Sequence, residues 1–125
     1  MTKERIEFYL NRNNTFGFNT ENDDKIVGWI KLSKLFPIQG FFEKFTHMAD
    51  PETFEKQMKI KREPYCVIIS QVTREVFDSD KYPGNEDYLL NTNYRFATLD
   101  DVEYFLKALG YDLANIKWGA DIDFL

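Results

Sequence analysis

The sequence contains a single cysteine, Cys66, and a single histidine, His47. One cysteine excludes a disulfide within the chain and fits a reducing compartment. A tight zinc site needs several cysteine and histidine ligands close together, which this chain cannot supply from two residues far apart in sequence. Cys66 also lies in an apolar run, which is typical of a small buried side chain rather than of an activated nucleophile.

A calcium site also lacks its ligands. The segment DSDKYPGNED begins like a calcium-binding loop, with Asp78 and Asp80 at suitable positions. Tyr82 and Pro83 then stand where the third ligand and the turn glycine belong, and Leu89 stands where the bidentate glutamate belongs. We therefore predict no metal ion and no cofactor.

Long hydrophobic runs are absent. No stretch of about 18 apolar residues occurs, so no transmembrane helix is expected. The first ten residues, MTKERIEFYL, carry too many charges for a secretory signal peptide. From the sequence we expect a cytoplasmic protein with no membrane partner.

Sequence motifs of catalysis are also missing, including a glycine-rich phosphate loop, GxSxG and HExxH. Two pairs of carboxylates have the chemistry for acid–base work. However, Asp100 and Asp101 suit the first turn of a helix, and Asp121 and Asp123 alternate with apolar residues as on an exposed strand face. We therefore expect a protein that is not an enzyme.

Positive charge is scarce, with 16 lysine and arginine residues against 21 aspartate and glutamate residues and a formal net charge of −5. Binding along a nucleic-acid backbone calls for a basic stripe, so direct nucleic-acid binding is not expected. An acidic balance favours encounter with a basic partner. One basic cluster interrupted by glutamates is typical of a solvated helix face; it comprises Lys56, Lys59, Lys61 and Arg62.

What the chain does contain is ample material for a core, with 43% hydrophobic and 17% aromatic residues. No repeat or linker divides its 125 residues, so we predict a single domain over residues 1–125. The expected fold class is α+β, with an antiparallel sheet of about five or six strands and about two or three helices mainly on one face.

The first third is predicted to be extended. Ile6, Phe8 and Leu10 alternate with more polar residues, and Phe16 and Phe18 alternate across a glycine. A third run follows at residues 26–30. The simplest account is a three-stranded meander over roughly residues 4 to 33.

The pattern changes period after Pro37. Apolar residues with helical spacing predict one helix: Ile38, Phe41, Phe42, Phe45 and Met48. Asp50, followed by a proline, predicts the start of a second short helix.

The run PYCVIISQV predicts a central strand covered on both faces, and REVFDS predicts a strand that forms a hairpin with it. The polar residues 80–93 are interpreted as a long surface loop. Thr98 and Gly110 mark the expected start and end of the best-defined helix. One or two short strands are predicted in the tail after residue 115.

The stretch Phe16-Gly17-Phe18 raises a question of function. Aromatic rings exposed on a strand can stack nucleic-acid bases, but alternating aromatic residues also arise from packing alone. We interpret these rings as core residues of a hairpin. Two alternatives stay open: a nucleic-acid or small-ligand binding module that stacks on Phe16, Phe18 and Trp29, and a structural subunit of a larger assembly.

Acidic residues and tyrosines are frequent in the loop, the last helix and the tail. If the fold brings these segments together, they form one negative face, in which tyrosines supply rigid contact area and carboxylates steer the encounter. The candidate partner-binding residues are Asp78, Asp80, Tyr82, Glu86, Asp87, Tyr88, Asp100, Asp101, Tyr104, Asp121 and Asp123.

These features together predict a small acidic inhibitor of the immunity or phage anti-defence kind. Its expected partner is a protein with a basic, nucleic-acid-binding surface, such as a nuclease or a toxin. It would occlude that surface by mimicking the charge of phosphates.

Overall fold

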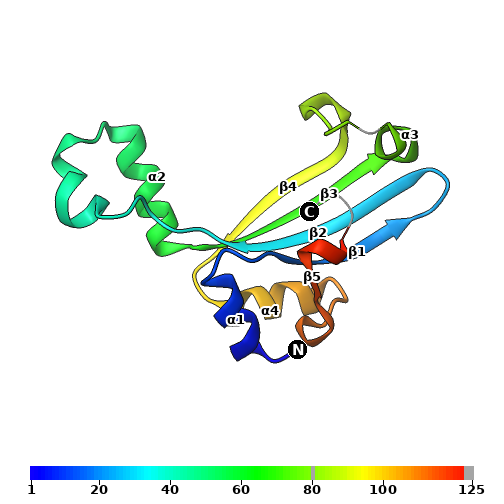
Figure 1. Cartoon of the computed structure of the whole chain (residues 1–125), viewed down its shortest axis with the longest axis horizontal. Coiled ribbons are helices and arrows are strands. Elements are labelled where there is room, and N and C mark those ends of the chain that lie inside the picture. The colour runs from blue at the N-terminus through cyan, green and yellow to red at the C-terminus, as the bar shows by residue number, and fades with distance from the viewer. Residues whose placement is uncertain (80, 123–125) are drawn as a thin grey trace.

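The computed structural model describes residues 1–79 and 81–122 and is built on a five-stranded antiparallel sheet (Figure 1). The order of the strands across the sheet is β4-β3-β2-β1-β5. The strands are β1 (Phe16–Asn22), β2 (Ile26–Lys34), β3 (Tyr65–Thr73), β4 (Tyr88–Phe96) and β5 (Lys117–Trp118). The α-helices are α1 (Lys3–Leu10), α2 (Pro51–Arg62), α3 (Arg74–Asp78) and α4 (Leu99–Ala108). The predicted α+β class is confirmed.

The prediction of a strand near the N-terminus is wrong, because residues 3–10 form helix α1. The Thr2 side chain accepts a hydrogen bond from the N–H of Arg5 and so caps the helix. Ile6 and Leu10 are four residues apart, a spacing that suits one face of a helix as well as one face of a strand. Both are fully buried, whereas Phe8 is 48% exposed. The predicted meander is therefore a helix followed by the β1–β2 hairpin.

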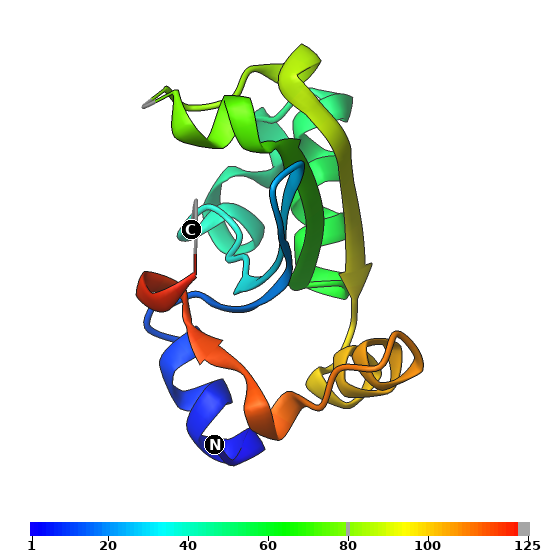
Figure 2. The ribbon, with the colours of Figure 1, turned by 90° about the vertical axis from the view of Figure 1, so that its right-hand side faces the viewer.

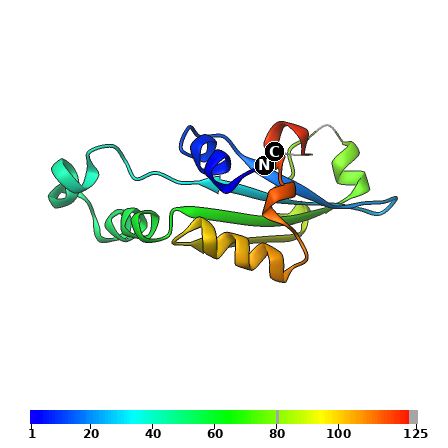
Figure 3. The ribbon, with the colours of Figure 1, turned by 90° about the horizontal axis from the view of Figure 1, so that it is seen from below.

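The connection between β2 and β3, residues 35–64, forms an arm that extends beyond the end of the sheet (Figures 1 and 3). The single helix predicted from Ile38 is wrong: a π-helical turn, η1 (Phe41–Phe45), and a 3₁₀ turn, η2 (Thr46–Met48), stand in its place. The second helix, α2, is confirmed, and the Asp50 side chain caps it by accepting from the N–H of Thr53 at 2.7 Å.

The central strand β3 is confirmed, but the strand predicted from REVFDS is wrong. Thr73 ends β3 and caps helix α3, because its side chain accepts a hydrogen bond from the N–H of Val76 at 3.2 Å. The neighbour of β3 is instead β4, which occupies part of the stretch predicted as a loop. A 3₁₀ turn, η3 (Asn85–Asp87), leads into it.

The last helix is confirmed. Thr98 caps α4 through the N–H of Asp101 at 3.1 Å, and Gly110 has the positive φ of 95° that favours glycine after a helix. The tail continues through η4 (Leu113–Asn115), β5 and η5 (Gly119–Asp121). One of the predicted terminal strands is thus present as β5.

The two faces of the sheet carry separate apolar clusters. Helices α1 and α4 cover one face, while α3 and the end of the tail lie on the other (Figure 2). The large cluster comprises Ile6, Leu10, Phe16, Phe18, Ile30, Leu32, Tyr65, Val67, Leu99, Val102, Leu106, Leu113 and Ile116. The small cluster comprises Val27, Trp29, Val72 and Ile122. Within residues 1–79 and 81–122, no helix has the length and apolar character needed to cross a bilayer.

Candidate functional site

The small cluster brings four distant segments together at one end of the sheet. Val76 and Phe77 of α3 pack against it, as does Tyr88 at the start of β4, and Ile122 follows η5 directly. The turn between β1 and β2 joins them, because Arg74 of α3 donates to the carbonyl oxygen of Asp23 at 3.1 Å. These segments therefore form one surface although they span residues 21–122.

This surface is strongly negative, and we call it the acidic end. Eight carboxylates stand against three cations among its described residues, and all of the carboxylates except that of Glu21 belong to exposed residues. The carboxylates are those of Glu21, Asp23, Asp24, Glu75, Asp78, Glu86, Asp87 and Asp121. The cations are Lys25, Arg74 and Lys81. The difference of five negative charges equals the net charge of the whole chain.

Part of this charge is used to hold the acidic end together. Asp23 accepts hydrogen bonds from the backbone N–H groups of Ile26 and Lys25, both at 2.8 Å, and these donors lower the pKa of its carboxyl. The Arg74 guanidinium lies 3.9 Å from Asp78. The outer carboxylates, such as that of Asp24, have no such partner within the described residues and remain free to meet an external cation.

Several of the predicted partner-binding residues lie in the acidic end: Asp78, Tyr82, Glu86, Asp87 and Asp121. Tyr82 is 91% exposed. Tyr88 is different, because its ring packs 6.4 Å from that of Trp29 and contributes to the small cluster. Asp80 and Asp123 lie outside the described residues.

The other predicted residues, Asp100, Asp101 and Tyr104, belong to α4 and are not part of the acidic end. The nine residues of β4 separate the two groups, which corresponds to about 30 Å at about 3.3 Å per residue. Asp100 is also paired with Lys3 at 2.9 Å, and this hydrogen bond raises the pKa of the lysine. The structure thus divides the predicted face into two groups.

The aromatic rings of the N-terminal hairpin are buried. Phe16, Phe18 and Trp29 are 0%, 8% and 3% exposed. The first two lie in the large cluster and Trp29 lies in the small one. The interpretation of Phe16 and Phe18 as core residues is confirmed, and none of the three rings offers an open face for a base to stack on.

A polar cluster between α1 and the sheet was not predicted. One carboxylate oxygen of Glu7 accepts hydrogen bonds from the Tyr65 hydroxyl and from Lys34 Nζ, the latter at 3.1 Å. Its other oxygen, Oε2, is buried without a partner. Burial first, and the contact with Glu7 second, raise the pKa of Tyr65. The spacing of these residues in sequence gave no sign of the contact, which joins α1 to β2 and β3.

Cys66 and His47 belong to different parts of the fold. Cys66 is buried in β3, and this burial raises the pKa of its thiol. His47 is exposed on η2 in the arm. In the part of the chain that the structure describes, no three His, Cys, Asp or Glu side chains are grouped to hold a metal ion.

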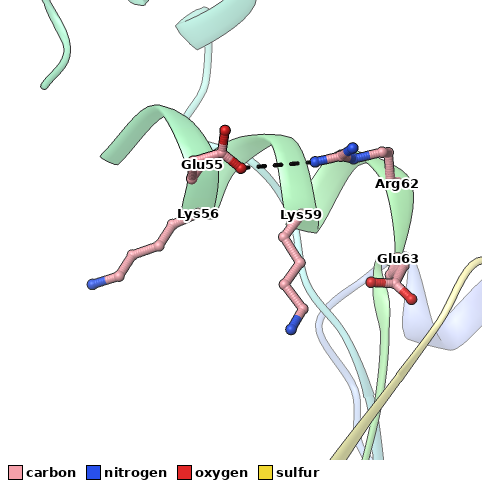
Figure 4. A pocket seen from close by; sticks show the side chains of 5 residues that line it. All are labelled: Glu55, Lys56, Lys59, Arg62 and Glu63. Atoms are coloured by element: carbon pink, nitrogen blue, oxygen red, sulfur yellow. Dashed lines mark ion pairs between the residues drawn. The ribbon is translucent and has the colours of Figure 1, made fainter. Parts of the chain in front are cut away.

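The arm carries two surfaces of different character. One face of α2 lines an open groove of about 660 Å³ with Lys56, Lys59 and Arg62 between two glutamates (Figure 4). Arg62 lies 4.0 Å from one of them, Glu55. Around η1 and η2, Met48 is 73% exposed and Phe45 is 43% exposed. The helical spacing of these apolar residues predicted a helix and gave no sign of this exposed surface.

Comparison with known proteins gives no relative: no family model, no curated protein and no solved structure matches this chain. The function must therefore be argued from the chain's own surfaces.

Proposed function

We propose that this chain is a non-enzymatic binding protein that docks its acidic end on a basic surface of a partner protein and thereby occludes that surface. The observation that carries the proposal is the gathering of eight carboxylates from four segments at one end of the sheet, against three cations. Like charges repel one another, so grouping the carboxylates creates a negative potential at this end of the molecule. Binding of a basic surface reduces the repulsion between them.

The geometry of the acidic end supports a docking role. Tyr82 is almost fully exposed beside the carboxylates and supplies rigid contact area. A basic groove that binds nucleic acid has the complementary potential, so occlusion of such a groove is the proposed mechanism. This is the role of an inhibitor of the immunity or phage anti-defence kind. The buried state of Phe16, Phe18 and Trp29 favours it over the base-stacking alternative.

Affinity capture from a lysate of the source organism at low and high salt tests the proposal. We expect one stoichiometric protein with a basic surface, released by salt. The triple variant Asp24→Asn, Glu75→Gln, Asp78→Asn removes three carboxylates from the acidic end and should weaken binding at least about tenfold.

A control variant changes the net charge by the same amount elsewhere: Glu4→Gln, Glu43→Gln, Asp101→Asn. We expect its affinity to stay within about twofold of the wild type, because these positions lie outside the acidic end. An equal loss of affinity in both triple variants would contradict the assignment of partner binding to the acidic end. Recovery of nucleic acid in place of a protein would contradict the proposed function itself.

A further inference from the structure

The outer edge of β4 is bare. β4 is the terminal strand of the sheet, and no strand among residues 1–79 and 81–122 pairs with its outer side. Figures 1 and 2 show it running along the margin of the molecule. Such an edge presents a row of backbone N–H and C=O groups that can pair with another strand.

Of the usual protections of an edge strand, β4 has one bulge and one charged side chain. Its sequence YLLNTNYRF contains no proline or lysine. Its one charged side chain, Arg95, donates to the carbonyl oxygen of Glu63 at 2.8 and 3.0 Å. A bulge places Leu89 as an extra residue near the start of the strand, and the register is regular from Leu90 onward. The seven residues from Leu90 to Phe96 therefore form a regular edge. Its one charged side chain, Arg95, is already hydrogen-bonded within the chain.

The opposite edge of the sheet, formed by β5 and the rest of β1, offers less regular backbone for pairing. β5 has only two residues and pairs with Phe16 and Gly17 of β1. Beyond that point β1 carries a bulge at Thr20 and the charged Glu21. A short partner, a bulge and a charge are devices that prevent further pairing. Because the bulge of β4 lies near its start, the seven regular residues from Leu90 onward form the edge that is open to a partner.

The sequence of β4 is nearly symmetric about Thr92. Antiparallel pairing of two copies with Thr92 opposite Thr92 puts Asn91 opposite Asn93 and Leu90 opposite Tyr94. Every one of these pairs joins side chains of like character, and no charged group faces another of the same sign. We propose that two copies of this chain form a two-fold symmetric dimer through this pairing, with a continuous sheet of five strands from each copy.

Exposed side chains on both faces of β4 are suited to this pairing. Leu90 and Tyr94 are 39% and 37% exposed and share the face covered by α4, where the Tyr94 ring lies 4.8 Å from that of Phe105. On the other face, the carboxamide oxygens of Asn91 and Asn93 accept hydrogen bonds from Ser70 and Cys66. Their nitrogens are left to donate to the asparagines of the second copy.

The charges at the ends of β4 complement one another in the dimer. Glu86 and Asp87 precede the strand, whereas Arg95 near its other end donates to the carbonyl oxygen of Glu63, the residue that follows α2. Antiparallel pairing brings the acidic turn η3 of one copy to the end of the sheet where Lys59 and Arg62 of the second copy lie (Figure 4). Glu86 and Asp87 of the acidic end thus take part in this contact, whereas the hairpin turn, α3 and η5 stay outside it.

Sedimentation equilibrium over a range of protein concentrations tests the dimer. We expect a mass of twice 14.9 kDa at high concentration and dissociation on dilution. The double variant Asn91→Lys, Asn93→Lys places cations opposite cations twice and should raise the dissociation constant at least about tenfold.

The matched variant Asn91→Lys, Asn93→Glu loses the same two asparagines but places lysine opposite glutamate twice, so it should dimerise about as well as the wild type. A wild type with the mass of one chain at all concentrations overturns the proposal. Equal dimerisation of the two variants, or equal dissociation of both, overturns the Thr92-centred register.

If a charged variant fails to fold, formation of a disulfide between two copies provides a second test of the dimer. Thr92→Cys places a thiol opposite its copy at a Cβ separation of about 4.5–5.5 Å, close to that of a disulfide. We expect a covalent dimer on mild oxidation. Asn19→Cys, exposed on the opposite edge, should stay monomeric on a non-reducing gel of the same reaction. No covalent dimer with Thr92→Cys, or equal dimer with both variants, contradicts the proposal.

Discussion

The two faces of the sheet are covered to very different extents. The face under α1 and α4 holds thirteen buried residues in one cluster, whereas the face under α3 holds four. The hydrophobic contribution grows with the apolar area removed from water, so most of the folding free energy lies on the α1/α4 face. The acidic end is built around the smaller cluster. The proposed binding surface therefore belongs to the less stable part of the molecule, as is common for regions that bind partners.

The largest effect is expected from a cavity in the large cluster. Leu106 of α4 is fully buried, and Leu106→Ala should lower the free energy of unfolding by about 3–4 kcal/mol, because it removes buried methyl groups and leaves a void. Leu109, three residues later, is 46% exposed, and Leu109→Ala should cost less than about 1 kcal/mol. Urea unfolding of both variants measures the difference, and similar losses would show that the buried face of α4 is wrongly assigned.

A pair of isoleucines compares the two faces directly. Ile116 lies in the large cluster and Ile122 in the small one, and each is 5% exposed. We expect Ile116→Ala to lower the free energy of unfolding by about 3 kcal/mol. Ile122→Ala should cost only about 1–2 kcal/mol, since a four-residue cluster at the end of the chain can relax or open locally.

Urea unfolding followed by circular dichroism measures both losses. Hydrogen exchange adds a second measure, because Ile122→Ala should speed the exchange of α3 amides and leave those of α4 unchanged. Equal losses of unfolding free energy in the two variants would mean that both clusters unfold as one unit and that the two faces do not differ in stability.

Helix caps were the most reliable sequence signals. Asp50 and Thr98 were identified from the residue type and the spacing, and both caps are present. The prediction of whole elements was wrong where a helix and a strand give the same pattern of apolar residues. The spacing of Ile6 and Leu10 fits a helix and a strand alike, and only the packing of α1 under the sheet decides between them. In REVFDS, Thr73 caps a short helix where the residues Val76 and Phe77 had suggested a strand.

The candidate site could be predicted only in part. Each carboxylate was visible in the sequence, but their grouping depends on the length and direction of β4, whose nine residues lie between Asp87 and the turn that precedes Asp100. β4 itself was missed because an edge strand exposes residues such as Leu89 and Asn93 on both sides, so its sequence resembles a loop. Asp23 and Asp24 at the hairpin tip lie beside α3, where Arg74 donates to the carbonyl oxygen of Asp23.

A smaller effect compares the two threonine caps. Thr98 begins α4 on the large cluster, and Thr98→Ala should lower the free energy of unfolding by about 1 kcal/mol because it leaves an N–H of the first turn without an acceptor. Thr73 caps the five-residue helix α3 with the same geometry. Thr73→Ala should cost about half as much in global unfolding, since α3 can unfold locally. Thermal unfolding measures the loss of stability in both variants. A larger loss for Thr73→Ala would show that the face covered by α3 is not the less stable one.

The smallest effect is a pH dependence confined to the α1/α4 face. Burial, and then the hydrogen bond to Glu7, raise the pKa of Tyr65 above its ordinary value of about 10. A hydroxyl whose pKa is higher in the folded than in the unfolded protein stabilises the fold fully below the unfolded pKa, and this contribution is lost as the pH rises above it. Tyr65→Phe removes both the hydroxyl and its titration. The difference in unfolding free energy between the wild type and Tyr65→Phe should therefore be constant from about pH 7 to 9 and shrink between about pH 10 and 11. Urea unfolding at each pH measures this difference. A difference that stays constant up to pH 11 would show that Tyr65 titrates alike in the folded and unfolded chain.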